Sequence, residues 1–175
     1  MNKLATVTAA ILLLAAATTA AAQAPNDAQI AAIVVTANQV DIDAGKLAEA
    51  KASHADVKAF AKQMVTDHSG VNKQAVALVT KLKVTPEDNA TAQSLKAGGI
   101  DNVRSLEKIS GAAFDRAYVE HEVAYHQQVL DAIDKVLIPG AQNAELKSLL
   151  VAVRPAFAAH LEHAKSLQAS LAKKS

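Results

Sequence analysis

The sequence predicts an all-α domain, and three observations carry that prediction. Apolar residues make up 51% of the chain, much of them alanine, a strong helix former, while aromatic residues make up only 3%. Tryptophan is absent, and no stretch alternates apolar and polar residues as a half-buried strand does. Long segments instead repeat apolar residues at steps of three and four, the spacing of one helix face. We expect an antiparallel bundle of four long helices with a short helical crossover.

The first 24 residues have the pattern of an export signal. Met1-Asn2-Lys3 is a short positive start, residues 4–19 are apolar and small, and Ala22-Gln23-Ala24 matches a signal-peptidase site. We expect cleavage after Ala24, which leaves residues 25–175 as one domain in a bacterial periplasm, with no membrane insertion. The alternative is an uncleaved anchor, for which the run is marginal against the ~20 apolar residues of a membrane span.

The first two long helices follow from their caps and apolar stripes. Asn26 or Asp27 can cap a helix whose apolar face runs from Ile30 to Leu47. Ser53, three residues before Asp56, resembles a capping box for the next helix, predicted over residues 55–82. His68 lies in phase with the apolar stripe of that helix, so we expect its ring to point inward.

The remaining segments complete the predicted bundle. Residues 87–109 form the crossover, because Gly98-Gly99 interrupts an otherwise helical pattern. A third long helix covers residues 112–137 and stops at Ile138-Pro139-Gly140, since proline and glycine disfavour continuation. A fourth begins near Asn143 and carries His160 in its apolar stripe.

Three histidines occupy core positions near the middles of their helices. In an antiparallel bundle, helix middles lie at one level, so the three imidazoles can converge there. Unpaired buried imidazoles are costly, and a transition metal would satisfy all of them at once. Carboxylates adjoin them in sequence or one helical turn away. The predicted metal-site residues are His68, His126, His160, Glu122, Asp67 and Asp41.

A simpler interpretation stays open beside the metal site. A histidine on an apolar helix face is usually a core residue that makes a hydrogen bond. Asp115, Tyr118, Glu122 or a water could be the partners in this chain. His54, His121 and His163 lie off the main stripes, so we place them outside the predicted site.

Charge and motifs exclude several function classes. The formal net charge is +1 with scattered lysines, so the chain has no electrostatic footprint for nucleic acid. Cysteine is absent, which excludes disulfides and thiolate-bound metals. No phosphate-binding glycine loop and no G-x-S-x-G nucleophile motif occurs. An enzyme that uses the tyrosines and histidines of residues 118–126 as acid and base is the weakest hypothesis.

Several separated motifs resemble one bacterial family. They are residues 57–68 (VKAFAKQMVTDH), Phe114-Asp115-x-x-Tyr118, His126, and Pro155 followed by residues 160–164 (HLEHA). This pattern is similar to the exported family called domain of unknown function 4142, over about residues 27–171. The resemblance implies a ferritin-like four-helix bundle and no particular activity. Di-iron bundles carry Glu-x-x-His on paired helices, and this chain has none, so oxygen-activating di-iron chemistry is not expected.

The sequence therefore predicts a periplasmic, non-enzymatic bundle that binds a divalent transition metal such as zinc, copper or iron. Metal buffering or a role in envelope stress would suit it. The alternative is a structural or interaction module of the envelope, with an envelope protein as partner and its histidines as core residues.

Overall fold

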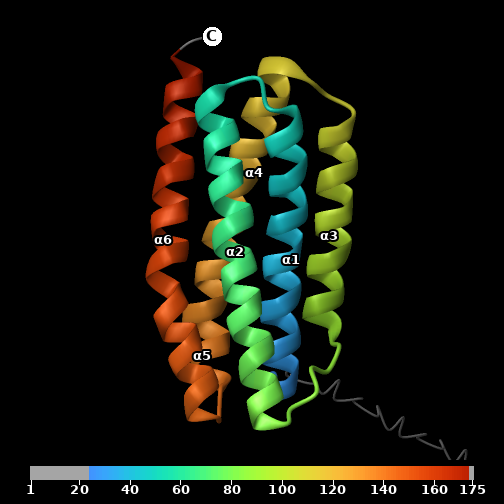
Figure 1. Cartoon of the computed structure of the whole chain (residues 1–175), viewed down its shortest axis with the longest axis vertical. Helices are drawn as coiled ribbons and strands as arrows, with labels where there is room; N and C mark the ends of the chain where they lie inside the picture. The colour runs from blue at the N-terminus through green and yellow to red at the C-terminus, as the bar shows by residue number, and fades with distance from the viewer. Residues whose placement is uncertain (1–23, 174–175) are drawn as a thin grey trace, which may run out of the picture.

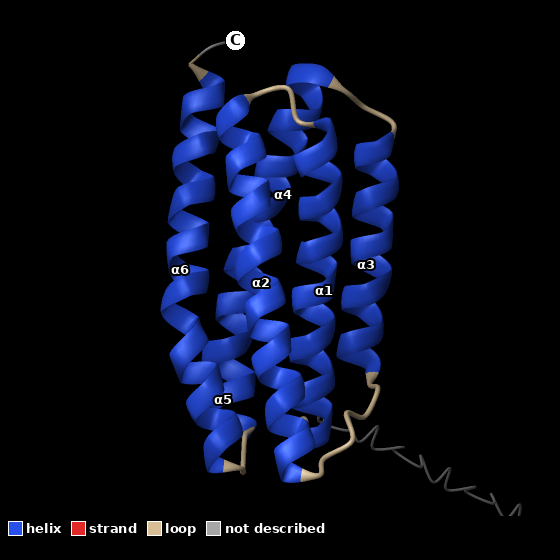
Figure 2. Cartoon of the chain, viewed as in Figure 1, coloured by secondary structure: helices blue, strands red, loops and turns tan. Residues whose placement is uncertain are grey.

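The computed structural model describes residues 24–173, which form helices joined by short loops, with no strand in this range (Figures 1 and 2). The all-α prediction is confirmed. None of these helices has the length and apolar character needed to cross a membrane. The elements are α1 (Asp27–Lys51), α2 (Ala55–Leu82), α3 (Ala90–Glu107), α4 (Gly111–Ala132), the π-helical η1 (Ile133–Leu137), α5 (Ile138–Gly140) and α6 (Ala144–Ala172).

Asparagine side chains begin three of the helices. Asn26 forms a capping box with Gln29 at the start of α1, and Asn89 and Asn143 accept backbone N–H bonds at the starts of α3 and α6. The α1 and α6 starts agree with the sequence prediction. These caps supply acceptors to N–H groups that have no partner within the helix.

The predicted cap of α2 is wrong, although the helix bounds are correct. The N-cap residue is His54, whose Nδ1 accepts from the Asp56 N–H at 3.3 Å. Ser53 instead donates from its backbone N–H and its hydroxyl to the buried Asp115 of α4. The His54 N–H donates to the same carboxylate at 2.9 Å. Asp115 therefore ties the α1–α2 connection to α4.

The segment around residues 87–109 is not a short, interrupted crossover. It contains a continuous helix, α3, which passes through Gly98-Gly99 without a break and lies along the outer side of α1 (Figure 1). A Cβ atom at residue 99 would lie 2.7 Å from both methyl carbons of Val40. Glycine at this position therefore serves close helix packing rather than a turn.

The helix ends within the predicted stop Ile138-Pro139-Gly140, three residues after the predicted last residue, 137. After Ala132 the helix continues through the π turn η1, where the Ile138 N–H donates to the Ile133 carbonyl, and ends at Gly140. Pro139 lies in the first turn of α5, where a proline is tolerated.

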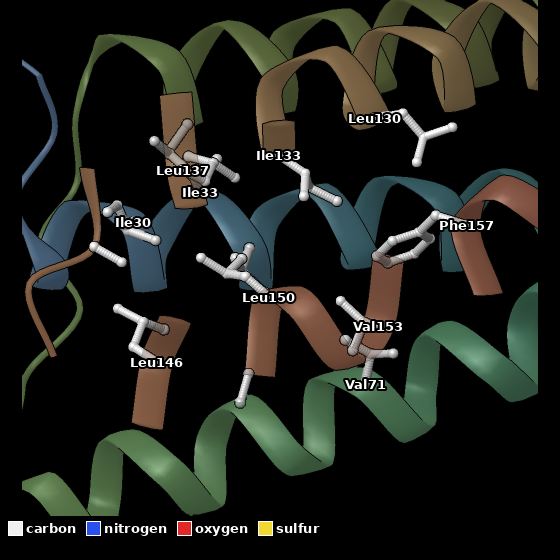
Figure 3. Close-up of a cluster of buried hydrophobic side chains, with 14 of the residues drawn as sticks. Ile30, Ile33, Val71, Leu130, Ile133, Leu137, Leu146, Leu150, Val153 and Phe157 are labelled. Atoms are coloured by element: carbon white, nitrogen blue, oxygen red, sulfur yellow. The ribbon is translucent and has the colours of Figure 1, made fainter. Parts of the chain in front are cut away.

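The core has two apolar clusters with a polar layer between them. One cluster contains Ile30, Leu130, Leu150 and their neighbours, ten of which are labelled in Figure 3. The other contains Phe60, Met64, Phe114 and Tyr118. On α1, α2 and α4, the buried residues Asn38, Asp41, His68, Glu122 and His126 lie between the positions that belong to the two clusters. On α6, His160 lies next to Leu161, the last residue of the first cluster, one turn before Ala164 of the second. The fold thus brings polar groups of four helices to one level.

Candidate metal centre

The polar layer draws residues from four helices. Its members are Asn38 and Asp41 of α1, His68 of α2, Glu122 and His126 of α4, and His160 of α6, each at most 3% exposed. The centroids of the three imidazole rings lie 5.3–5.5 Å apart. The prediction that the three histidines converge at one level is confirmed.

His68 is held by an amide that fixes its orientation. Its Nδ1 lies 2.8 Å from Oδ1 of Asn38, and the Asn38 amide nitrogen donates to the Val34 carbonyl at 2.8 Å. Because this amide nitrogen is engaged, Oδ1 is the acceptor and Nδ1 of His68 carries the proton. The lone pair of His68 is therefore on Nε2, which is buried and has no hydrogen-bond partner among residues 24–173.

His126 and His160 follow the same scheme with different anchors. Nδ1 of His126 donates to the Glu122 carbonyl at 3.1 Å, and Nε2 of His160 donates to Oδ2 of Asp67 at 2.9 Å. In the described part of the chain, Nε2 of His126 and Nδ1 of His160 are buried without a hydrogen-bond partner. Each of the three rings thus has one anchored nitrogen and one buried nitrogen with a lone pair.

Asp41 lies against two of these rings. Its Oδ2 is 3.1 Å from Nε2 of His68 and 3.5 Å from Nε2 of His126. Complete burial raises the pKa of Asp41 well above its usual range, and the nearby Glu122 carboxylate raises it further. Burial, together with the neighbouring His126 and His160, lowers the pKa of His68 to about 2. His68 is therefore a neutral imidazole at neutral pH, and burial favours the protonated form of Asp41.

Glu122 adds a second buried carboxyl. Its Oε2 lies 3.4 Å from Nδ1 of His126, and neither carboxyl oxygen has a hydrogen-bond partner within the region that the structure describes. Burial raises the pKa of Glu122 to about 8, with the Tyr118 hydroxyl opposing that rise. Burial and the carboxylates of Glu122 and Asp41 raise the pKa of Tyr118. The layer consequently contains several buried oxygen and nitrogen atoms that could act as metal ligands.

The donor geometry suits a metal ion. His68, His126 and His160 can each offer one nitrogen so that all three lie within 4.8 Å of one another, and Asp41, Glu122 and His126 form a second such group. Two ligand atoms of a tetrahedral site with bonds of about 2.0–2.1 Å are about 3.3–3.4 Å apart. The distances from Asp41 Oδ2 to the two Nε2 atoms bracket that value.

One predicted site residue lies at the edge of the layer. The Asp67 side chain is 40% exposed; it accepts from Gln63 and, among the layer residues, contacts His160, whose ring it orients. Of the histidines placed outside the site, His163 packs its ring edge against Phe60, and His121 stacks on Tyr125. The three ring histidines, Asp41 and Glu122 are brought together, whereas Asp67 supports them from outside.

Sequence reasoning missed Asn38. A signal was present, because Asn38 lies three residues before Asp41 and four after Val34, the spacing of one helix face. The predicted apolar face of α1 included Val40, and that residue contacts α3 instead. The face that bears Asn38 and Asp41 is the one that meets the histidines.

Comparison with known proteins gives a family and no further relatives. No curated protein and no solved structure matches the chain. The family model described as "Domain of unknown function (DUF4142)" matches residues 13–167, which is most of the chain. The chain therefore belongs to the DUF4142 family, as its separated motifs predicted.

Proposed function

We propose that the protein is a periplasmic, non-enzymatic, ferritin-like bundle that binds one transition-metal ion through His68, His126 and His160. One observation carries the proposal. Each ring has one nitrogen anchored to an oxygen acceptor and one buried nitrogen without a partner in the described chain. Outer partners of this kind fix the tautomer of histidines that bind metals.

Asp41 is the proposed fourth ligand, and Glu122 a carboxylate that supports or completes the site. Three imidazoles and a carboxylate suit zinc, copper or iron, since no thiolate is available to select a softer ion. Metal binding would replace the protons of Asp41 and Glu122, because a carboxylate must be ionised to coordinate. The chain would then serve to buffer metal or to respond to envelope stress.

The architecture proposed is an antiparallel four-helix bundle of α1, α2, α4 and α6, with α3 added on the outside of α1. The support is the course of the chain in Figure 1, where successive long helices run in alternating directions along one axis. The export signal and the periplasmic location rest on the sequence pattern. All of the leader except Ala24 lies outside the described residues.

Metal content of the exported protein tests the proposal. The wild type, His126→Ala and His163→Ala would be purified from the periplasm under mild conditions without chelators and measured by inductively coupled plasma mass spectrometry. His163→Ala is the matched control, because it removes an exposed imidazole that packs against Phe60 and lies outside the polar layer. We expect about one ion per chain in the wild type and the control, and none in His126→Ala. Equal, near-zero metal in all three would refute metal binding.

A second candidate is a structural or interaction module of the envelope. The observation that favours it is that every histidine of the layer already makes a hydrogen bond, with Asn38, Glu122 or Asp67 as the partner. This module would show no change in thermal unfolding on addition of zinc, copper or a chelator. A metal-binding protein would instead gain about 2.7 kcal/mol at a free ion concentration of 100 times Kd.

A further inference from the structure

A small cavity lies against the polar layer, on the side of the apolar cluster that contains Ile30, Leu130 and Leu150. Its volume is about 30 Å³, and the rings of His68 and His126 form part of its wall. Aliphatic side chains and the Phe157 ring form most of the remainder, so the surface that faces the cavity is almost entirely apolar. All of its lining residues are buried except Ala37 and Val129, which are half-buried.

A second pocket adjoins this cavity on its outer side. It has a volume of about 180 Å³ and lies between α1, α3 and the α4–η1 segment. The two spaces share four wall residues, Ala37, Tyr125, Val129 and Leu137. The Tyr125 hydroxyl donates to the Ala37 carbonyl at 2.8 Å, which places the phenol side chain in the partition between them.

The π turn forms part of the cavity wall. Ile133 begins η1 and Leu137 ends it, and both side chains line the cavity. A π turn holds an extra residue relative to an α turn, which shifts the buried face of the helix at this point. Such turns occur frequently beside functional sites.

The size and chemistry of the cavity define what it can hold. A space of about 30 Å³ exceeds the ~10–15 Å³ that one water needs, but a water also requires two or more polar partners. Apolar cavities stay dry and take up apolar molecules such as xenon. A charged or strongly hydrated ligand would lose its solvation without replacement.

We infer that this cavity binds a neutral diatomic molecule, of the class of dioxygen or nitric oxide, against the rings of His68 and His126. The molecule enters through the pocket beside Tyr125. The binding itself needs no metal. Delivery of that molecule to a bound ion would rest on the proposed function.

Xenon is a suitable probe, and the metal-free full-length protein is the sample. Methyl carbon–proton spectra would be recorded as xenon pressure rises. We expect saturable shifts at the methyls of Ile133 and Val153, which line the cavity, and none at the exposed Val151. Because no metal is present, a failure here and a failure of metal binding are separate results.

Two filling variants and one control complete the test. Val129→Phe and Ala37→Leu each add volume at the shared wall, and either should weaken xenon binding at least about tenfold. The control Val151→Phe adds the same ring as Val129→Phe, but at an exposed position, and should leave xenon binding unchanged. Circular dichroism identifies a filling variant that fails to fold. The test then rests on the filling variant that does fold. No saturable shift in the wild type, or undiminished binding in the folded filling variants, would overturn the inference.

Discussion

Nε2 of His68 and Oδ2 of Asp41 lie 3.1 Å apart in a fully buried site, although each is a hydrogen-bond acceptor when its group is in its ordinary neutral-pH form. Two facing acceptors repel unless a proton or a cation lies between them. Burial raises the pKa of the Asp41 carboxyl, which favours a proton at this contact when no cation is bound. A proton and a metal ion therefore compete for the space between Nε2 of His68 and Oδ2 of Asp41.

The variant Asp41→Asn distinguishes the effect of the proton from that of the metal ion. The amide of the variant can donate an N–H to Nε2 of His68 and, unlike the buried carboxyl, does not have to take up a proton when the chain folds. We expect the metal-free variant to be more stable than the wild type by about 1–3 kcal/mol in urea unfolding. Its zinc affinity should fall at least about tenfold in a chelator competition. Equal zinc affinity in both proteins would show that Asp41 is not a ligand.

Glu122 should make the metal-free protein less stable as the pH rises. An unfolded glutamate titrates near 4.5, whereas burial raises the pKa of Glu122 to about 8 in the folded state. Between these values the folded protein holds a proton that the unfolded chain has released, so raising the pH favours unfolding. From pH 6.5 to 8 this group alone should lower the free energy of unfolding by about 1–2 kcal/mol.

Urea unfolding in the presence of a chelator, at pH 6.5 and at pH 8, measures this decrease in the free energy of unfolding. In Glu122→Gln the part of the decrease that comes from Glu122 should be absent. Asp41 contributes with the same sign in the variant, so a smaller decrease remains. An identical decrease in both proteins would mean that Glu122 does not hold its proton in the folded state.

Asn38 should control metal affinity without being a ligand. Its carbonyl oxygen holds the Nδ1 proton of His68, which leaves Nε2 for the ion. Asn38→Ala removes that anchor, and changes to such outer partners typically weaken metal binding about 10–100-fold. Isothermal titration should still show one ion per chain. Complete loss of the site would indicate that Asn38 acts through the fold, which urea unfolding of the metal-free variant would reveal.

The adjacent glycines of α3 provide a matched pair. Gly99→Ala places a Cβ atom 2.7 Å from the methyls of Val40 and should cost about 1–3 kcal/mol. Gly98→Ala meets nothing within 4 Å and should stabilise the protein by about 0.5–1 kcal/mol, because alanine favours helix. Thermal unfolding of both variants tests the packing of α3 on α1. A stabilising Gly99→Ala would contradict it.

Asp115 should matter for stability and not for metal. Its carboxylate accepts from the Ser53 and His54 N–H groups and from the Ser53 hydroxyl. Asp115→Ala removes the shared acceptor and should lower the free energy of unfolding by about 3 kcal/mol. Zinc stoichiometry at low temperature should remain that of the wild type, since the hydrogen bonds of Asp115 within residues 24–173 run to Ser53 and His54, outside the polar layer.

Periodicity predicted the histidines well because α2, α4 and α6 each bury a clear stripe. His68, His126 and His160 interrupt these stripes, and their mid-helix positions were enough to place them at one level. On α1 the same reasoning was less successful. This helix is covered by α3 as well as by the histidine-bearing side, so buried residues surround much of it and no single face stands out.

Two other features depend on tertiary packing. Gly98-Gly99 reads as a break in sequence, and only the approach of Val40 shows that residue 99 belongs inside a helix. The π turn at Ile133–Leu137 has no composition that distinguishes it from an α turn. The cavity beside it could not be predicted from the sequence for the same reason.

The polar layer takes its side chains from α1, α2, α4 and α6, so residues more than a hundred positions apart in the chain meet there. A denatured polypeptide would scatter these donors and hold an ion poorly. Release of a bound ion would then require the helices to separate, and its dissociation rate would follow the opening of the whole domain. A coloured ion such as cobalt(II) would in that case report directly on the native population.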